Sequence, residues 1–335
     1  MKLATPRWWY VRERPAMPVT RFLLTPFGWI AAALTARRIA TTTPVDPGVP
    51  VICVGNFTVG GTGKTPIVRE LLHRLKARGL AAHALTRGYG GSLPGPVRVD
   101  PALHTAREVG DEPLMLCADG PVWVSRDRPQ GAWAAIVEGA DVIVMDDGHQ
   151  NPTLKKTLSL VVVDGETRDN EWPFGDGAVF PAGPMREPLR AGLARTDAVI
   201  LMMPADLAEP DPALLNLFGA IPVLVARLEP VAPPPAGPIL AFAGIGKPWK
   251  VERSLTAAGA DLADFIRFGD HQPYDEATLA TLDSQAKAAN ATLLTTEKDW
   301  ARLPPAWRGR VTSWPVVARF EDPAALEALL ETAIH

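Results

Sequence analysis

The chain has 335 residues, and its 34 basic and 37 acidic side chains give a net charge of −3. Hydrophobic residues make up 47% and charged residues 21%, which excludes a wholly disordered chain. Two cysteines, Cys53 and Cys117, are too few for a disulfide framework or a four-ligand zinc site, and they indicate a reducing compartment. This length is typical of two domains.

The N-terminal segment, residues 1–40, differs in charge from the rest of the chain. Seven basic side chains against Glu13 alone give it +6, so the other residues carry −9. Aromatic and aliphatic residues lie among these charges. The apolar run at 22–34 is too short for a spanning helix, which needs about 20 residues, and Pro26 interrupts it. The segment is therefore predicted to lie at a bilayer surface, with a helix packed on its own domain as the alternative.

In residues 41–228, short apolar runs alternate with helical patterns. This alternation predicts a parallel sheet covered on both faces. A helix is expected at 66–80, because its apolar residues recur every three to four positions. Strands are expected at 49–54, 82–86, 122–125, 141–145, 158–164, 198–203 and 222–226.

A proline-rich stretch, residues 229–238, ends this series and is predicted to be a stiff connector. A second, smaller α/β unit is expected at 239–335. Its strands are expected at 239–243, 263–267, 291–295 and 310–317, and its helices at 250–258, 275–290 and 323–332.

A glycine-rich string, VGNFTVGGTGKTP at 54–66, follows the first predicted strand and opens the first predicted helix. In this context backbone N–H groups and a helix N-terminus bind phosphate, although a plain glycine-rich turn is the alternative. Lys64 is expected to reach the β- and γ-phosphates of ATP, and the Thr65 hydroxyl to bind Mg²⁺. The predicted nucleotide-binding residues of the loop are Thr58, Val59, Gly60, Gly61, Thr62, Gly63, Lys64 and Thr65.

Two acidic pairs are candidates for the metal and the chemistry. Asp146 and Asp147 end an apolar strand, which is typical of carboxylates that organise Mg²⁺, although a strand followed by a turn has the same pattern. Asp111 and Glu112 precede an apolar helix, where acidic residues also serve as ordinary caps.

Three further motifs lie in predicted loops. His271 follows a strand of the second unit, and Arg186 lies between prolines in a loop suited to phosphate contacts. The string TTEKD at 295–299 is interpreted as a helix cap.

Together these strings resemble the tetraacyldisaccharide 4′-kinase family, the lipid A 4′-kinases of Gram-negative bacteria. The likeness runs in order from residue 1 to nearly the C-terminus, and threonine at position 58 matches the family's loop. The strings that carry it are VGNFTVGGTGKTP at 54–66, TRGYGG at 86–91, GDEP at 110–113, DDGHQ at 146–150, PAGPMREP at 181–188, FAGIGKP at 242–248, GDHQPY at 269–274 and TTEKD at 295–299. His149 in the fourth string has no assigned role.

The resemblance implies a peripheral kinase on the cytoplasmic face of the inner membrane. Its reaction would transfer the γ-phosphoryl group of ATP to the 4′-hydroxyl of a tetraacylated glucosamine disaccharide 1-phosphate, with ATP and Mg²⁺ as cofactors. The resemblance further implies that Asp111 and His271 form a catalytic dyad and that Arg186 contacts the γ-phosphate. The implied metal-side residues are Thr65, Glu112, Asp146 and Asp147.

The predicted fold class is α/β: a P-loop NTPase-type parallel-sheet domain at 41–228, a smaller α/β domain at 239–335 and an N-terminal membrane-associating helical segment. Neither nucleic acid nor an obligatory protein partner is expected. Two other functions remain open at this point: a membrane-attached P-loop ATPase switch, and a P-loop kinase with a soluble substrate. A switch would hydrolyse ATP without an acceptor, whereas a kinase would depend on one.

Overall fold

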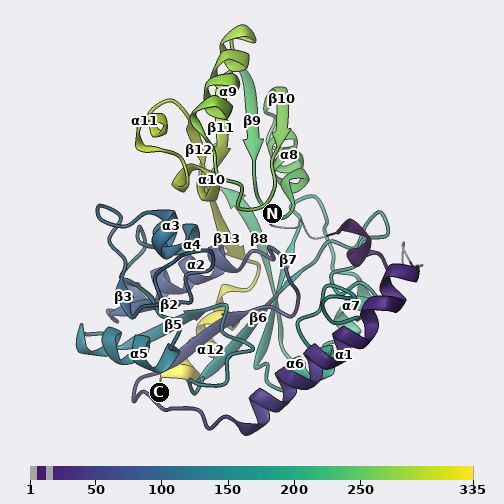
Figure 1. The fold of residues 1–335 in the computed structure, drawn as a ribbon, viewed down its shortest axis with the longest axis vertical. Helices are drawn as coiled ribbons and strands as arrows, with labels where there is room; N and C mark the ends of the chain where they lie inside the picture. Colours follow the sequence, from purple (N-terminus) through teal and green to yellow (C-terminus); the bar gives the residue numbers. More distant parts are fainter. Residues whose placement is uncertain (1–5, 13–17, 335) are drawn as a thin grey trace.

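The computed structural model describes residues 6–12 and 18–334, and two sheets dominate it (Figure 1). The larger sheet has the strand order β13-β8-β7-β6-β1-β5-β2-β4-β3, parallel except at its two edge strands, β3 and β13. Its strands are β1 (Val51–Gly55), β2 (Ala82–Thr86), β3 (Val97–Arg98), β4 (Val122–Val124), β5 (Val142–Asp146), β6 (Leu158–Asp164), β7 (Ala198–Met203), β8 (Val223–Pro230) and β13 (Val316–Phe320).

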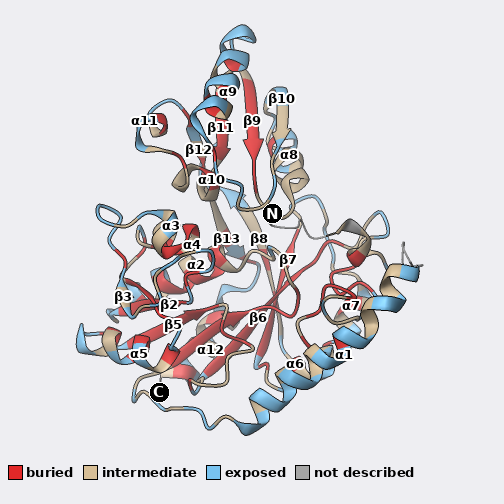
Figure 2. Ribbon diagram, viewed as in Figure 1, coloured by how far each residue is buried: buried red, intermediate tan, exposed pale blue. Residues whose placement is uncertain are grey.

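Both faces of the larger sheet are buried, as the continuous apolar runs predict (Figure 2). Ile52 of β1 belongs to the core that α2 and α12 cover, whereas its neighbour Cys53 belongs to the core under α5. The helices of this part are α2 (Lys64–Ala77), α3 (Ala106–Val109), α4 (Asp111–Leu116), α5 (Arg128–Val137), α6 (Leu189–Leu193), α7 (Pro212–Asn216) and α12 (Pro323–Ile334).

The smaller sheet stands beyond one edge of the larger one, with the strand order β10-β9-β11-β12 (Figure 1). Its strands are parallel, and Phe242, Leu279 and Trp307 lie in its core. Its elements are β9 (Pro238–Ala243), α8 (Pro248–Ala257), β10 (Asp261–Arg267), α9 (Glu276–Ala288), β11 (Thr292–Thr296), α10 (Glu297–Ala301), α11 (Pro305–Arg308) and β12 (Thr312–Trp314).

The single strand expected at 310–317 is two strands in different sheets. β12 ends at Trp314 in the smaller sheet, whereas β13 pairs antiparallel with β8 in the larger one. Pro315 separates them, and a proline has no N–H to continue a strand ladder. The chain therefore returns to the larger sheet for β13 and α12, so the expected unit 239–335 does not coincide with one sheet.

The N-terminal segment forms a longer helix than its apolar run indicates. Helix α1 (Pro18–Thr41) passes through Pro26 and continues through alanines, which favour helix. Among the described residues, 19–41 are long and apolar enough to cross a membrane, by length and composition alone. Residues 1–5 and 13–17 of the predicted segment lie outside the described residues.

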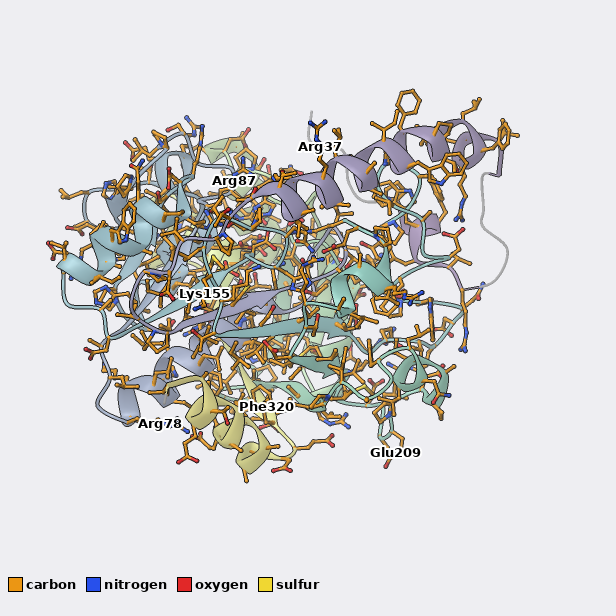
Figure 3. The ribbon with its side chains drawn as sticks, turned by 90° about the horizontal axis from the view of Figure 1, so that it is seen from below. Arg37, Arg78, Arg87, Lys155, Glu209 and Phe320 are labelled. Atoms are coloured by element: carbon orange, nitrogen blue, oxygen red, sulfur yellow. The ribbon has the colours of Figure 1, made fainter. Side chains whose placement is uncertain are left out.

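Helix α1 lies lengthwise against the body of the protein and exposes most of its surface (Figure 3). Gly28 permits a close approach, because a Cβ there would lie 2.6 Å from the carbonyl oxygen of Val179. Arg21 pairs with Asp176, and Arg38 donates to the Gln150 carbonyl. The exposed large apolar side chains of the helix are Val19, Phe22, Leu23, Phe27, Trp29, Ile30 and Leu34.

Candidate active site

The phosphate-binding loop predicted from the sequence connects β1 to α2, at the carboxyl end of the parallel strands. Gly60 (φ 99°) and Gly63 (φ 85°) have left-handed backbone, which glycine adopts without strain. The loop is held from outside: the Val59 N–H donates to the Pro184 carbonyl (2.8 Å), and the Tyr10 hydroxyl donates to the Val59 carbonyl (2.5 Å). The strand–loop–helix context required for phosphate binding is therefore present.

Two cations meet at this loop on one carboxylate. Lys64 Nζ lies 3.4 Å from Asp147 Oδ1, and Arg186 Nη1 lies 2.8 and 2.9 Å from the two Asp147 oxygens. The Arg186 Nε also donates to the Thr58 carbonyl (3.0 Å). Burial raises the pKa of Asp147, but the charges of Lys64 and Arg186 outweigh it and hold that pKa well below its usual range. Both cations are thus fixed beside the loop.

Asp146 is the carboxylate that protein groups leave unpaired. It is 1% exposed at the end of β5, and both its oxygens are buried without a hydrogen-bond partner among the described residues. Burial and the charge of Glu112 raise its pKa. A buried carboxylate without partners is costly, so the position suits a cation.

The other residues predicted to bind phosphate or metal do not form one cluster of carboxylates. Thr65 is buried in the first turn of α2, and the Thr62 hydroxyl is buried with no hydrogen-bond partner among residues 6–12 and 18–334. Gly61 has room for a Cβ. In the part of the chain that the structure describes, no group of three or more His, Cys, Asp or Glu could hold a metal by itself. Mg²⁺ needs only one or two carboxylates when phosphates supply other oxygens, so Asp146 fits this ion.

Asp111 and His271 come together from two different sheets. Asp111 is the first residue of α4, and His271 lies in the loop after β10 with a left-handed φ of 57°. The His271 Nδ1 lies 2.8 Å from Asp111 Oδ2, and the Glu112 N–H donates to Asp111 Oδ1 (3.0 Å). Burial raises the pKa of Asp111, but the hydrogen bond to His271 and the charge of Lys298 lower it to about 2. The carboxylate is therefore ionised at neutral pH.

Lys298 and Arg302, which sequence reasoning did not single out, surround this pair. Lys298 Nζ lies 3.3 Å from His271 Nε2, and Arg302 Nε lies 3.7 Å from Asp111 Oδ2. Lys298 belongs to the TTEKD string, interpreted as a helix cap. Thr296 does cap α10 by accepting from the Asp299 N–H (3.1 Å). No signal in that string shows which side chain points to the dyad.

A groove of about 1350 Å³ opens beside the dyad. Asp111 and His271 both line it, together with Tyr89 from the loop after β2. The rest of its lining comes largely from residues 101–107 and 114–118 on one side and 300–305 on the other. The groove thus lies between α3 and α4 of the larger sheet and the α10–α11 region of the smaller one.

Ion pairs join the two sheets around the site. Lys247 Nζ and Lys250 Nζ lie 2.6 and 2.5 Å from the Asp164 carboxylate, which ends β6. Burial raises the pKa of Asp164, but the two lysines outweigh it and hold that pKa far below its usual range. Arg69 of α2 lies 2.7 Å from Glu297 of α10. These pairs hold the smaller sheet over the phosphate-binding loop.

His149 is a buried structural residue beneath the loop. Its Nδ1 lies 3.1 Å from Ser159 Oγ, and its Nε2 lies 3.1 Å from the Gly192 carbonyl. Burial lowers its pKa to about 3, helped by nearby Lys156. Gly55 packs on it so closely that a Cβ would lie 2.4 Å from His149 Cβ. The imidazole is therefore neutral at physiological pH.

Comparison of the sequence with known proteins places the chain in one family. The sequence model of the family described as "Tetraacyldisaccharide-1-P 4′-kinase" matches residues 20–335. The chain is 69% identical over 332 residues to the tetraacyldisaccharide 4′-kinase of Caulobacter sp. (strain K31), covering 99% of both chains. It is 66% identical over 330 residues to the enzyme of that name from Phenylobacterium zucineum (strain HLK1), covering 98% of this chain and 99% of the other.

A solved structure shares the fold. The crystal structure of LpxK from Aquifex aeolicus in complex with ATP matches with a TM-score of 0.74 at 24% identity, covering 95% of this chain and 100% of that one. At this identity the likeness concerns the fold, and it agrees with the α/β class predicted from the sequence. The extent of the sequence matches decides the family: the chain belongs to the tetraacyldisaccharide-1-P 4′-kinases.

Proposed function

We propose that this protein is an ATP-dependent kinase that phosphorylates the 4′-hydroxyl of a tetraacylated glucosamine disaccharide 1-phosphate. The family supports the reaction, and one contact carries the chemistry: His271 Nδ1 lies 2.8 Å from Asp111 Oδ2, across the interface above the phosphate-binding loop. A kinase needs such a proton acceptor near the phosphates, because its acceptor hydroxyl must lose a proton.

The test follows ³²P from γ-labelled ATP, with and without the tetraacyldisaccharide 1-phosphate. We expect label in the lipid product and little ATP hydrolysis without the acceptor. Acceptor-independent hydrolysis would instead indicate an ATPase switch. Labelling of a soluble sugar in preference to the lipid would indicate a different kinase.

For ATP we assign the loop residues 58–65 and Arg186 to the phosphates. Lys64 and Arg186 are already held beside the loop by Asp147, so they need little reorganisation to meet negative charge. The N-terminus of α2 adds a partial positive charge. Such preorganised charges stabilise the transferring phosphoryl group.

For Mg²⁺ we assign Asp146 and the Thr65 hydroxyl as the principal protein ligands. Glu112 and Asp147 border this position, although Lys298 pairs with the first and Arg186 with the second. When bound, Mg²⁺ would neutralise charge on the phosphates. The observation that supports the assignment is the pair of buried, unpartnered Asp146 oxygens.

For proton transfer we assign Asp111 as the base and His271 as its partner. The low pKa of Asp111 keeps it ionised and able to accept a proton, while making it a weak base in the ground state. A weak base suffices, since phosphoryl transfer has a loose transition state that depends mainly on positioning and charge. His271 Nδ1 lies 2.8 Å from the carboxylate, where an Nδ1–H would donate to it and fix its orientation.

We further propose that α1 holds the protein peripherally at the cytoplasmic face of the inner membrane. The helix is fixed along the body of the protein, so it cannot cross a bilayer without carrying the body into it. Its exposed aromatic and aliphatic side chains suit the interface, and Arg37 is exposed beside them (Figure 3). An acylated acceptor would lie in the same membrane.

Sedimentation with anionic vesicles tests the membrane proposal. Deleting residues 1–35 should release the protein from the vesicles, and Arg37→Gln should weaken binding by about 1 kcal/mol at low salt. Lys155→Gln, at an exposed lysine of the larger sheet's domain, is the control and should bind like the wild type. A truncated protein that still pelleted with vesicles would contradict the role of α1.

A further inference from the structure

The TTEKD string does more than cap a helix. α10 begins directly after β11 and lies against α4, the helix that carries Asp111 and Glu112. The Thr296 cap fixes the direction of the first turn, so Glu297 pairs with Arg69 (2.7 Å) while Lys298 points to the dyad. Both side chains reach the larger sheet's part: Glu297 pairs with Arg69, whereas Lys298 contacts Glu112 of α4 and also His271 of the dyad.

Lys298 is surrounded by polar side chains next to the Asp111–His271 dyad. Its Nζ lies 3.1 Å from Glu112 Oε1, 3.3 Å from His271 Nε2 and 4.0 Å from Asp270 Oδ1. Burial lowers the pKa of Lys298, but the negative charges of Glu112 and Asp111 outweigh it and raise that pKa. The side chain is thus an ammonium group in this position.

The charge of Lys298 decides how His271 carries its proton. An ammonium group can only donate, so the His271 Nε2 that faces it at 3.3 Å is the acceptor, whereas Asp270 Oδ1, at 3.7 Å from the same nitrogen, lies beyond hydrogen-bond distance. The proton of the neutral ring then lies on Nδ1, which faces Asp111 Oδ2 at 2.8 Å. With the opposite tautomer, Nε2–H would meet the ammonium and Nδ1 would present a lone pair to a carboxylate.

We propose that Lys298 is a positioning residue for phosphoryl transfer, which fixes His271 in the tautomer that donates from Nδ1 to Asp111. This proposal rests on the proposed kinase function for its kinetic consequence. Lys298 acts through His271 and Glu112 and needs no contact with the reacting atoms. Groups that orient a reacting residue in this way typically affect activity by about 10–100-fold.

Two variants of Lys298 and one control separate positioning from domain contact. Lys298→Met removes the donor, whereas Lys298→Gln keeps a neutral donor that can face Nε2. Arg69→Met is the control: it removes the ion pair with Glu297, which joins the same turn of α10 to the larger sheet's part, together with the ion pair between Arg69 and Asp119. Among the described residues, no contact joins Arg69 to the dyad. Circular dichroism checks that each variant is folded, and Lys298→Ala replaces Lys298→Met if the latter does not fold.

The first readout is kinetic. We expect Lys298→Met to lower kcat by about 10–100-fold with little change in the KM for ATP, and Lys298→Gln to recover part of that loss. Arg69→Met should lower kcat by less than Lys298→Met does. Equal losses in the Lys298→Met and Arg69→Met proteins would overturn the proposal, because Lys298 would then be an interdomain contact only.

The second readout needs no substrate. The ¹⁵N chemical shifts of the His271 ring, assigned by comparison with His271→Gln and followed through a pH series to the neutral ring, report which nitrogen carries the proton. We expect the Nδ1–H form in the wild type and a mixture in Lys298→Met. An unchanged tautomer in Lys298→Met would overturn the proposal. If the wild type failed to phosphorylate the lipid, the proposed function would fail, while this measurement would still decide the role of Lys298.

Discussion

The phosphate-binding loop and the Asp111–His271 pair are built in opposite ways. The loop is one stretch of chain between adjacent elements, and it rests on the buried core of one sheet. The pair joins residues 160 positions apart from two sheets, and ion pairs between those sheets hold it together. The residues predicted to bind the nucleotide therefore lie in one part of the fold, whereas the proposed base is complete only when both parts meet.

The largest expected effect is on the assembled pair. Asp111→Ala and His271→Ala should each lower kcat by about 10²–10⁴-fold, because the acceptor hydroxyl loses its base or the base loses its orientation. ATP affinity should change little, since neither side chain belongs to the loop. Steady-state kinetics together with calorimetric titration of ATP check both statements.

The double variant sharpens this prediction. If Asp111 and His271 act as one unit, removing both should be barely worse than the worse single variant. Kinetic losses that multiply would show that the two side chains act independently. A marked loss of ATP affinity in either single variant would also argue against the separation of the two regions.

A smaller effect is expected at the loop. Lys64→Ala removes a preorganised cation and should lower kcat by about 10²–10³-fold, with weaker ATP binding. Lys76→Ala, at an exposed position near the end of the same helix, is the control. The same two assays apply, and near-normal turnover in a folded Lys64→Ala protein would remove the assignment of the loop.

The ion pairs between the sheets should affect turnover through the Asp111–His271 pair and have little effect on ATP binding at the loop. Asp164→Asn leaves Lys250 without its carboxylate and Lys247 with only Glu171, at 3.7 Å. Because both lysines are partly exposed, we expect a cost below that of an unpaired, fully buried charge, which is about 3–5 kcal/mol. The contact between the two parts of the fold is then weaker, so we expect kcat to fall about tenfold while ATP affinity stays within a few-fold. Small-angle scattering should show a larger radius of gyration.

An exposed pair provides the control for this experiment. Asp46→Asn removes the ion pair with Lys155 and keeps a side-chain oxygen that can accept from the Gly48 N–H, and such surface ion pairs contribute little. It should leave kcat and the scattering curve unchanged. Unaltered turnover in Asp164→Asn would mean that the interface holds the dyad without these lysines.

The smallest expected effect concerns His149, which is buried beneath the loop. The pKa of His149 is lowered to about 3 by burial, so between about pH 6.5 and 3 the unfolded chain binds a proton that the folded chain does not. Stability should therefore fall as the pH decreases through this window, by up to about 1.4 kcal/mol per pH unit. Urea unfolding of the wild type and His149→Gln at several pH values measures this slope, which the variant should reduce.

The matched control for this slope is His104→Gln, at a partly exposed imidazole. It should keep a slope close to that of the wild type. Equal slopes in the wild type and His149→Gln would show that His149 is not held neutral by its surroundings.

Local patterns in the sequence predict much of the larger sheet. The strands expected at 82–86, 158–164 and 198–203 coincide with β2, β6 and β7. Apolar, β-branched runs specify such strands because both faces of the sheet are buried. The expectation for 310–317 was wrong, since a run of strand-forming residues does not show that Pro315 lies between two sheets. The apolar run at 22–34 is likewise shorter than helix α1 (Pro18–Thr41), because residues with high helix propensity extend the helix beyond the run.

The sequence by itself predicted the phosphate-binding loop, because glycines, a lysine and a threonine at fixed spacing depend only on neighbouring residues. Eight strings in order along the chain carried the resemblance to the family. Only the tertiary structure decided that His271 meets Asp111, that Lys298 meets His271, and that Asp146 is unpaired while Asp147 holds two cations. The physical reason is that hydrogen bonds and ion pairs depend on distances of about 3–4 Å. For His271 and Asp111, 160 positions apart, the packing of the two sheets sets that distance.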